Sequence, residues 1–139
     1  MQGLGALTAG IMLTPTWSYA GDMGETLAYS PGLIKKALAD GKTVFVDYAA
    51  DWCSTCAAQE RAVNALRSET PAYNKAMVFV RVDWDEYSDH DVATTRNIPR
   101  RSTLILLRGE EELGRIVAGT AKQAIKELMD KGLDMAASG

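Results

Sequence analysis

The hydrophobic and polar positions beyond residue 20 follow two different periods along the chain. Thr43–Ala49 and Met77–Asp83 are nearly continuous runs of β-branched, aromatic and other apolar residues, which predicts strands buried on both faces. Residues 54–67 instead place apolar side chains every three to four positions, as an amphipathic helix does. One acidic residue, Asp47, interrupts the first apolar strand.

Turn and cap residues predict two more helices. Ser30 is expected to cap a helix that has Pro31 at its first position and ends at Gly41. The last helix is expected to begin with Thr120 in a capping box and to end at Gly132.

Two further strands, Thr103–Leu107 and Leu113–Gly119, are joined by a short charged link, which favours an antiparallel hairpin. Residues 88–97 predict a short polar helix or loop. Alternating helices and strands followed by a hairpin predict an α/β domain, with a central mixed sheet and helices on both faces.

The composition is that of one soluble domain and narrows the function. The chain has 139 residues and a formal net charge of -3, without a basic run, so nucleic acid is not an expected partner. It has no apolar run of 18 residues, and two cysteines with one histidine cannot fill a structural zinc site. No cofactor site is evident.

The first twenty residues differ from the rest. A short apolar segment, Leu4–Leu13, precedes the small residues Ser18 and Ala20, as in a secretory signal, although no basic residue occurs before Lys35. We expect residues 1–20 to be a signal segment or a flexible leader, 21–133 the domain, and 134–139 a flexible tail. A signal segment would place the protein in an oxidising compartment such as a bacterial periplasm.

The two cysteines, Cys53 and Cys56, lie where the strand 43–49 gives way to a helix. Free amides and the helix dipole at this junction favour a thiolate on Cys53, which we expect to be exposed. Cys56 lies nearly one turn later on the inward face, so it is placed to resolve a mixed disulfide. A structural disulfide is the weaker alternative because so short a loop stabilises little, and a metal pair lacks nearby ligands other than His90.

The stretch "VDYAADWCSTC" resembles the active-site segment of the thioredoxin superfamily. Its "ADWC" is similar to the C-terminal domain of transmembrane disulfide reductases and to periplasmic thioredoxin-like proteins, and the resemblance covers residues 26–132. It implies a three-layer sandwich, a buried Asp47 that relays the proton of Cys56, and a Trp52 that contacts substrate. Arg81 matches a basic residue of the family and is a candidate partner for Asp47.

This sequence departs from the family pattern in two places. Ser54 and Thr55 separate the cysteines, where thioredoxins have Gly-Pro. The cis-proline that faces the cysteines in the family is matched either by Ser102, if the following strand is aligned without a gap, or by Pro99 after an insertion. Arg100 and Arg101 are expected near the cysteines in both cases, and Arg101 and Ser102 are candidate substrate contacts.

Together these features predict a thiol–disulfide oxidoreductase, with Cys53, Cys56 and Asp47 as its catalytic residues. Because residues 84–102 leave no room for an inserted helical domain, we expect a small monomeric reductase or electron carrier. Its partners would be protein disulfides and, as electron donor, a membrane disulfide reductase. The alternatives are a soft-metal module that holds or delivers copper through the same pair, and a redox-silent interaction domain.

Overall fold

A five-stranded mixed sheet forms the centre of the protein. The computed structural model describes residues 24–138. The strands are β1 (Thr26–Ala28), β2 (Thr43–Ala49), β3 (Met77–Asp83), β4 (Thr103–Arg108) and β5 (Glu111–Val117). Their order is β1-β3-β2-β4-β5; the first three are parallel, and β4 and β5 run antiparallel to their neighbours. The predicted mixed sheet is therefore confirmed, and so is the hairpin.

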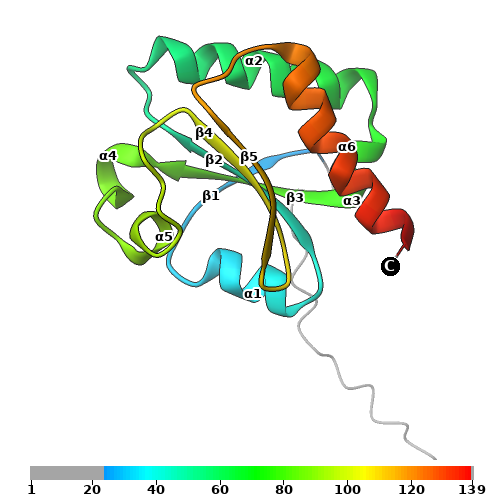
Figure 1. The fold of residues 1–139 in the computed structure, drawn as a ribbon, viewed down its shortest axis with the longest axis horizontal. Coiled ribbons are helices and arrows are strands. Elements are labelled where there is room, and N and C mark those ends of the chain that lie inside the picture. The colour runs from blue at the N-terminus through cyan, green and yellow to red at the C-terminus, as the bar shows by residue number, and fades with distance from the viewer. Residues whose placement is uncertain (1–23, 139) are drawn as a thin grey trace, which may run out of the picture.

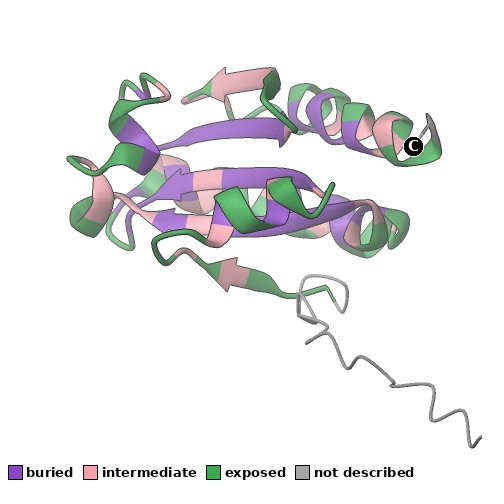
Figure 2. Cartoon of the chain, turned by 90° about the horizontal axis from the view of Figure 1, so that it is seen from below, coloured by how far each residue is buried: buried purple, intermediate pink, exposed green. Residues whose placement is uncertain are grey.

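Helices cover both faces of this sheet (Figure 1). They are α1 (Leu33–Ala39), α2 (Ser54–Glu69), α3 (Ala72–Ala76), α4 (Trp84–Tyr87), α5 (Asp91–Thr94) and α6 (Lys122–Ser138). One apolar cluster joins α1 and α5 to the sheet, and a second joins α2, α3 and α6 to the opposite face. Figure 2 shows the buried residues concentrated in the central strands between these layers.

Alternation along β2 decides which face each side chain reaches. Val44, Val46 and Tyr48 belong to the cluster under α1, whereas Phe45 belongs to the cluster under α2 and α6. Since successive side chains of a strand point to opposite faces, Asp47 shares the α2 face with Phe45. The bounds predicted for β2 and β3 agree with the structure.

Several expected element boundaries are wrong. The short edge strand β1 and the helix α3 were not predicted. Gly32, with a φ of 91°, is the N-cap of α1, and no side chain caps that helix, so Ser30 does not have the expected role. Helix α6 continues through Gly132 to Ser138, so residues 134–138 are helical where a flexible tail was expected.

Gly132 has a packing function rather than a terminating one. A Cβ at this position would overlap the side chain of Met77, which is buried at the start of β3. The glycine therefore allows α6 to approach the sheet closely.

None of the helices among residues 24–138 is long and apolar enough to cross a membrane. The predicted leader, residues 1–20, lies outside the described residues.

Candidate active site

The cysteine pair lies at the junction of β2 and α2. Cys53 is the N-cap residue of α2, with extended backbone angles, and its Sγ accepts a hydrogen bond of 3.1 Å from the amide of Cys56. The two sulfurs are joined as a disulfide, and the Cα atoms lie 5.3 Å apart. A cap position usually holds an oxygen that accepts from the first turn, and here sulfur accepts instead. The amide at this end stabilises negative charge on Cys53 once the pair is reduced.

Both cysteines are buried, which corrects the expectation that Cys53 is exposed. Cys53 is 5% exposed and Cys56 is 3% exposed, and they form a small apolar cluster with Ala49 and Ala50. Trp84 of α4 packs against this cluster. A tight turn leads from β2 to the pair, in which the amide of Cys53 donates to the carbonyl of Ala50 at 3.1 Å.

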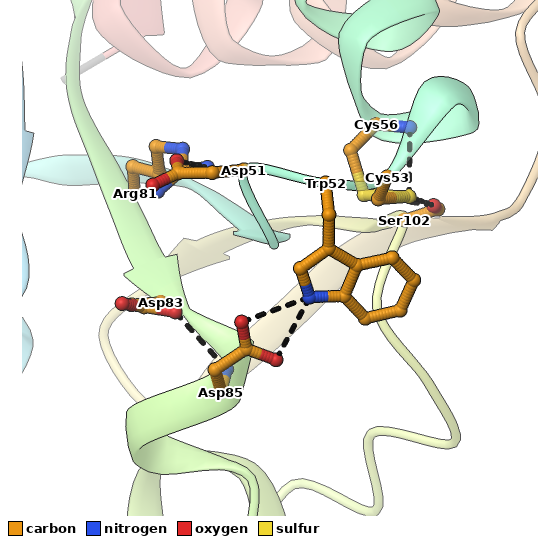
Figure 3. Close-up of polar contacts among 8 residues, drawn as sticks. All are labelled: Asp51, Trp52, Cys53, Cys56, Arg81, Asp83, Asp85 and Ser102. Carbon is orange, nitrogen blue, oxygen red and sulfur yellow. Dashed lines mark hydrogen bonds and ion pairs between the residues drawn. A yellow bond between two sulfur atoms is a disulfide. The ribbon is translucent and has the colours of Figure 1, made fainter.

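Ser102 faces both sulfurs from the loop before β4 (Figure 3). Its Oγ lies 3.2 Å from Sγ of Cys53 and 3.0 Å from Sγ of Cys56, and the residue is fully buried. The peptide bond before it is trans, as are all those of the described residues, and its φ is 62°. Pro99, the other candidate for this place, is exposed. The position opposite the cysteines therefore holds a hydroxyl in a left-handed backbone conformation.

Gln59 of α2 holds this loop and was not predicted as a site residue. The side chain is fully buried, and its Nε2 donates to the carbonyl of Ser102 at 3.0 Å and to the carbonyl of Gly119 at 2.9 Å. The amide of Ser102 donates to the carbonyl of Tyr48 at 2.7 Å. The amide of Ala118 donates to the carbonyl of Ser102, also at 2.7 Å. A glutamine within the apolar arc of a helix was the only sequence signal for this contact.

Asp47 lies on the α2 face of β2, beside a cavity of about 30 Å³ that Glu60 and Arg81 also line. Its Oδ1 is buried and has no hydrogen-bond partner. Burial raises the pKa of Asp47 to about 7; the positive charge of Arg81 opposes this shift, and Glu60 adds to it. Arg81 is adjacent to Asp47 in the strand register, but its ion pair of 2.9 Å is with the exposed Asp51.

Trp52 lies exposed beside the cysteines, held by contacts on two sides. It is 62% exposed, and its Nε1 donates to both carboxylate oxygens of Asp85 at 2.9 and 3.2 Å (Figure 3). Asp83 is the N-cap residue of α4, and its side chain accepts from the amide of Asp85 at 3.0 Å, which orders the backbone that carries the Asp85 carboxylate. The guanidinium carbon of Arg101 lies 4.3 Å from the centre of the indole ring, which is a cation–π contact.

The remaining predicted residues, Arg100, Arg101 and His90, do not form a metal site with the cysteines. Arg100 donates from Nε to the carbonyl of Arg101 at 2.9 Å, while Nε of Arg101 is buried without a partner. His90 stacks edge to face on Tyr87, with the ring centres 5.1 Å apart. Residues 24–138 contain no group of three or more His, Cys, Asp or Glu side chains able to hold a metal ion.

These features define a class of protein. A C-x-x-C pair at the start of the helix that follows a central strand, in a sheet of this order, is the site of a thiol–disulfide oxidoreductase. A family profile described as Thioredoxin-like matches residues 26–111, and the chain belongs to this family.

Individual relatives agree with this assignment. Thioredoxin H-type of Brassica campestris is 30% identical over 105 residues, which cover 76% of this chain and 80% of the relative. Thioredoxin H2-1 of Oryza sativa subsp. japonica is 32% identical over 87 residues, 63% of this chain, and the chain spans only 59% of that relative.

Solved structures are similar as well. Trxlp from Edwardsiella tarda EIB202 superposes with a TM-score of 0.66 at 28% identity, covering 76% of this chain and 98% of that one. Thioredoxin NaTrxh from Nicotiana alata gives a TM-score of 0.62 at 28% identity and covers 77% of this chain and 91% of that one. The predicted membership of the thioredoxin superfamily and the predicted three-layer sandwich are confirmed.

Proposed function

We propose that the protein is a reductase or electron carrier of the bacterial periplasm, which reduces protein disulfides and is itself reduced by a membrane disulfide reductase. The observation that carries this proposal is the cysteine pair at the start of α2, where the Cys56 amide bonds the Cys53 sulfur. A sulfur that is favoured as thiolate, next to a second one within disulfide reach, is what exchange requires.

The reaction uses the pair in two steps. The Cys53 thiolate attacks one sulfur of a protein disulfide, the substrate S–S bond breaks, and the other substrate sulfur leaves as a thiolate. Cys56 then loses its proton and attacks Sγ of Cys53, so that the mixed disulfide breaks and the second substrate sulfur leaves. The substrate gains two electrons and two protons, and the protein is left as the disulfide.

Asp47 is the proposed acceptor of the Cys56 proton. It lies on the face of β2 that α2 covers, and a carboxyl with a pKa of about 7 is partly ionised near neutral pH. Its buried Oδ1 has no hydrogen-bond partner, and the adjacent cavity has the volume of about one water molecule. The proton can therefore leave Asp47 by this cavity.

Trp52 and Arg101 form the proposed substrate contact. The indole is exposed but fixed by Asp85 and by the guanidinium, so it offers a rigid apolar surface beside the sulfurs. The charge of Arg101, with that of Arg100, favours substrates that carry acidic residues near their disulfide.

The direction of electron flow is proposed from the connection between β3 and β4. Residues 84–102 contain only the four-residue helices α4 and α5, so no inserted domain covers the cysteines. This compact form suits a carrier that exchanges with several partners. A membrane disulfide reductase is the proposed donor because the periplasm has no NADPH.

The test is to trap partners with Cys56→Ser. Without its resolving sulfur, Cys53 should remain linked to its substrates in a periplasmic extract, and reducing agent should release them for identification. Cys53→Ser is the matched control and should trap none. Stoichiometric Cu(I) binding by the parent protein without any trapped partner would favour the soft-metal module instead, and the absence of both would indicate an interaction domain.

The proposed compartment has its own test. The apolar segment Leu4–Leu13 and the small residues Ser18 and Ala20 support export. The full chain, expressed in a bacterium, should be released by osmotic shock with a new amino terminus near Gly21. Full-length protein that stays with the cytoplasmic fraction would contradict this location.

A further inference from the structure

One hydroxyl group faces both active-site sulfurs. Oγ of Ser102 is 3.2 Å from Sγ of Cys53 and 3.0 Å from Sγ of Cys56, and no solvent reaches the residue (Figure 3). A hydroxyl has one hydrogen, so it can donate to only one of two acceptors at a time. Rotation of that hydrogen about the Cβ–Oγ bond moves the donor from one sulfur to the other.

The two sulfurs depend on this hydroxyl unequally. Sγ of Cys53 also accepts from the Cys56 amide at 3.1 Å and lies at the start of a 16-residue helix. For Sγ of Cys56, Ser102 is the one hydrogen-bonding partner found among residues 24–138. A thiolate on Cys56 therefore has Ser102 as its principal source of stabilisation.

We propose that Ser102 is a catalytic residue whose hydroxyl shares the Cys53 thiolate with the Cys56 amide and then becomes the main hydrogen-bond donor to the Cys56 thiolate. This inference rests on the proposed exchange reaction and adds a component to it. When Cys53 attacks the substrate, its negative charge passes to the leaving sulfur, and the hydroxyl is free to turn. Cys56 then loses its proton to a base and attacks Sγ of Cys53 while the hydroxyl supports its charge. The hydroxyl keeps its own proton throughout.

Gln59 is the positioning residue for this donor. Ser102 has a φ of 62°, a conformation that a non-glycine residue adopts only when its surroundings hold it. Two backbone hydrogen bonds and the Nε2 of Gln59 fix the Ser102 amide and carbonyl. Because Gln59 and the cysteines belong to the same helix, the hydroxyl stays in register with both sulfurs.

The test separates attack from resolution. A symmetrical aromatic disulfide with a coloured leaving thiolate is mixed with the reduced protein in a stopped-flow instrument. The first equivalent of colour reports the attack by Cys53, and the second reports resolution by Cys56. Ser102→Ala and Ser102→Gly both remove the hydroxyl, and the glycine variant also relieves the left-handed backbone. Either one therefore serves if the other folds poorly.

We expect the second phase to be about 4- to 15-fold slower in both variants, since a hydrogen bond to a charged group is lost while the less stabilised thiolate gains nucleophilicity. The rate of the first phase should change by less than about threefold, because the Cys56 amide still donates a hydrogen bond to the Cys53 sulfur. The apparent pKa of the second phase should rise more than that of the first. Gln59→Leu should show the same asymmetry, whereas a purely structural role would slow both phases alike.

Each outcome decides the proposal. Equal slowing of both phases, or no change in either, would overturn the role of Ser102 while leaving disulfide exchange in place. A parent protein that releases no colour at all would overturn the exchange reaction, and the role of Ser102 with it.

Discussion

Asp47→Asn should make the protein more stable, by an amount that grows with pH. The carboxyl lies on the buried face of β2, and its Oδ1 has no hydrogen-bond partner. Burial therefore raises the pKa of Asp47 to about 7 in the folded protein, from an ordinary value of 3.8. Asparagine has nearly the same shape as the protonated acid and never becomes charged, so it removes only the ionisation.

Proton linkage gives the sign and size of this change in the free energy of unfolding. Between pH 4 and pH 7 the folded protein keeps a proton on Asp47 that the unfolded chain has lost. The contribution of Asp47 to the free energy of unfolding is therefore most favourable below about pH 4, is lost as the pH rises to about 7, and changes little above that pH. With folded and unfolded pKa values of about 7 and 3.8, ionisation costs about 2 kcal/mol at pH 5 and about 4 kcal/mol at pH 8.

Urea unfolding followed by tryptophan fluorescence measures this difference. The oxidised protein is used, because its cysteines do not titrate. The advantage of Asp47→Asn over the parent should increase by roughly 2–3 kcal/mol from pH 5 to pH 8, about 1–2 M in the urea midpoint. Asp89→Asn, which removes an exposed carboxylate near α5, is the matched control and should run parallel to the parent. If the Asp47→Asn curve is also parallel to the parent, Asp47 ionises normally and cannot be the proposed proton acceptor.

Three further predictions test the surroundings of the site. Arg81→Met should raise the pKa of Asp47 further, since the guanidinium now lowers it, and the carbon-13 shift of the Asp47 carboxyl should titrate at higher pH. Gly132→Ala should destabilise the protein by about 1 kcal/mol despite its better helix propensity, because the new methyl overlaps Met77; urea unfolding should show the loss, and shortening Met77 should remove it. Arg101→Ala should slow reduction of an acidic peptide disulfide by roughly threefold or more and leave a neutral peptide unaffected, and equal slowing of both would exclude charge recognition.

The sequence was sufficient for those features that depend on local pattern. The strands β2 and β3 are apolar on both faces because both faces are covered, and their predicted bounds agree with the structure. The C-x-x-C spacing at a strand-to-helix junction was likewise enough to place Cys53 as the N-cap of α2. In each case the deciding physics operates within a few residues.

Features that depend on distant contacts were missed or wrong. The burial of Cys53 depends in part on Trp84 of α4, a residue distant in sequence that packs against the cysteine cluster. Gly132 resembles a helix terminator in sequence, but Met77 in another element determines why it is glycine. Gln59 resembled an ordinary core position because its acceptors lie 43 and 60 residues away. No local window contains these partners.

The chemistry of the site follows from how the sheet brings three segments together. β2 carries Asp47 on the face that α2 covers, α2 carries both sulfurs at its start, and the loop before β4 presents Ser102 to them. Because β2 pairs directly with β4, the loop cannot move away from the sulfurs without breaking the hydrogen bond from the Ser102 amide to Tyr48 at the end of β2. A proline in this loop has no amide hydrogen to make that bond, whereas serine makes it and adds a hydroxyl donor. The substitution therefore exchanges a rigid apolar contact for a hydrogen bond at the reacting atoms, and we expect its effect to appear in the step that depends on the Cys56 thiolate.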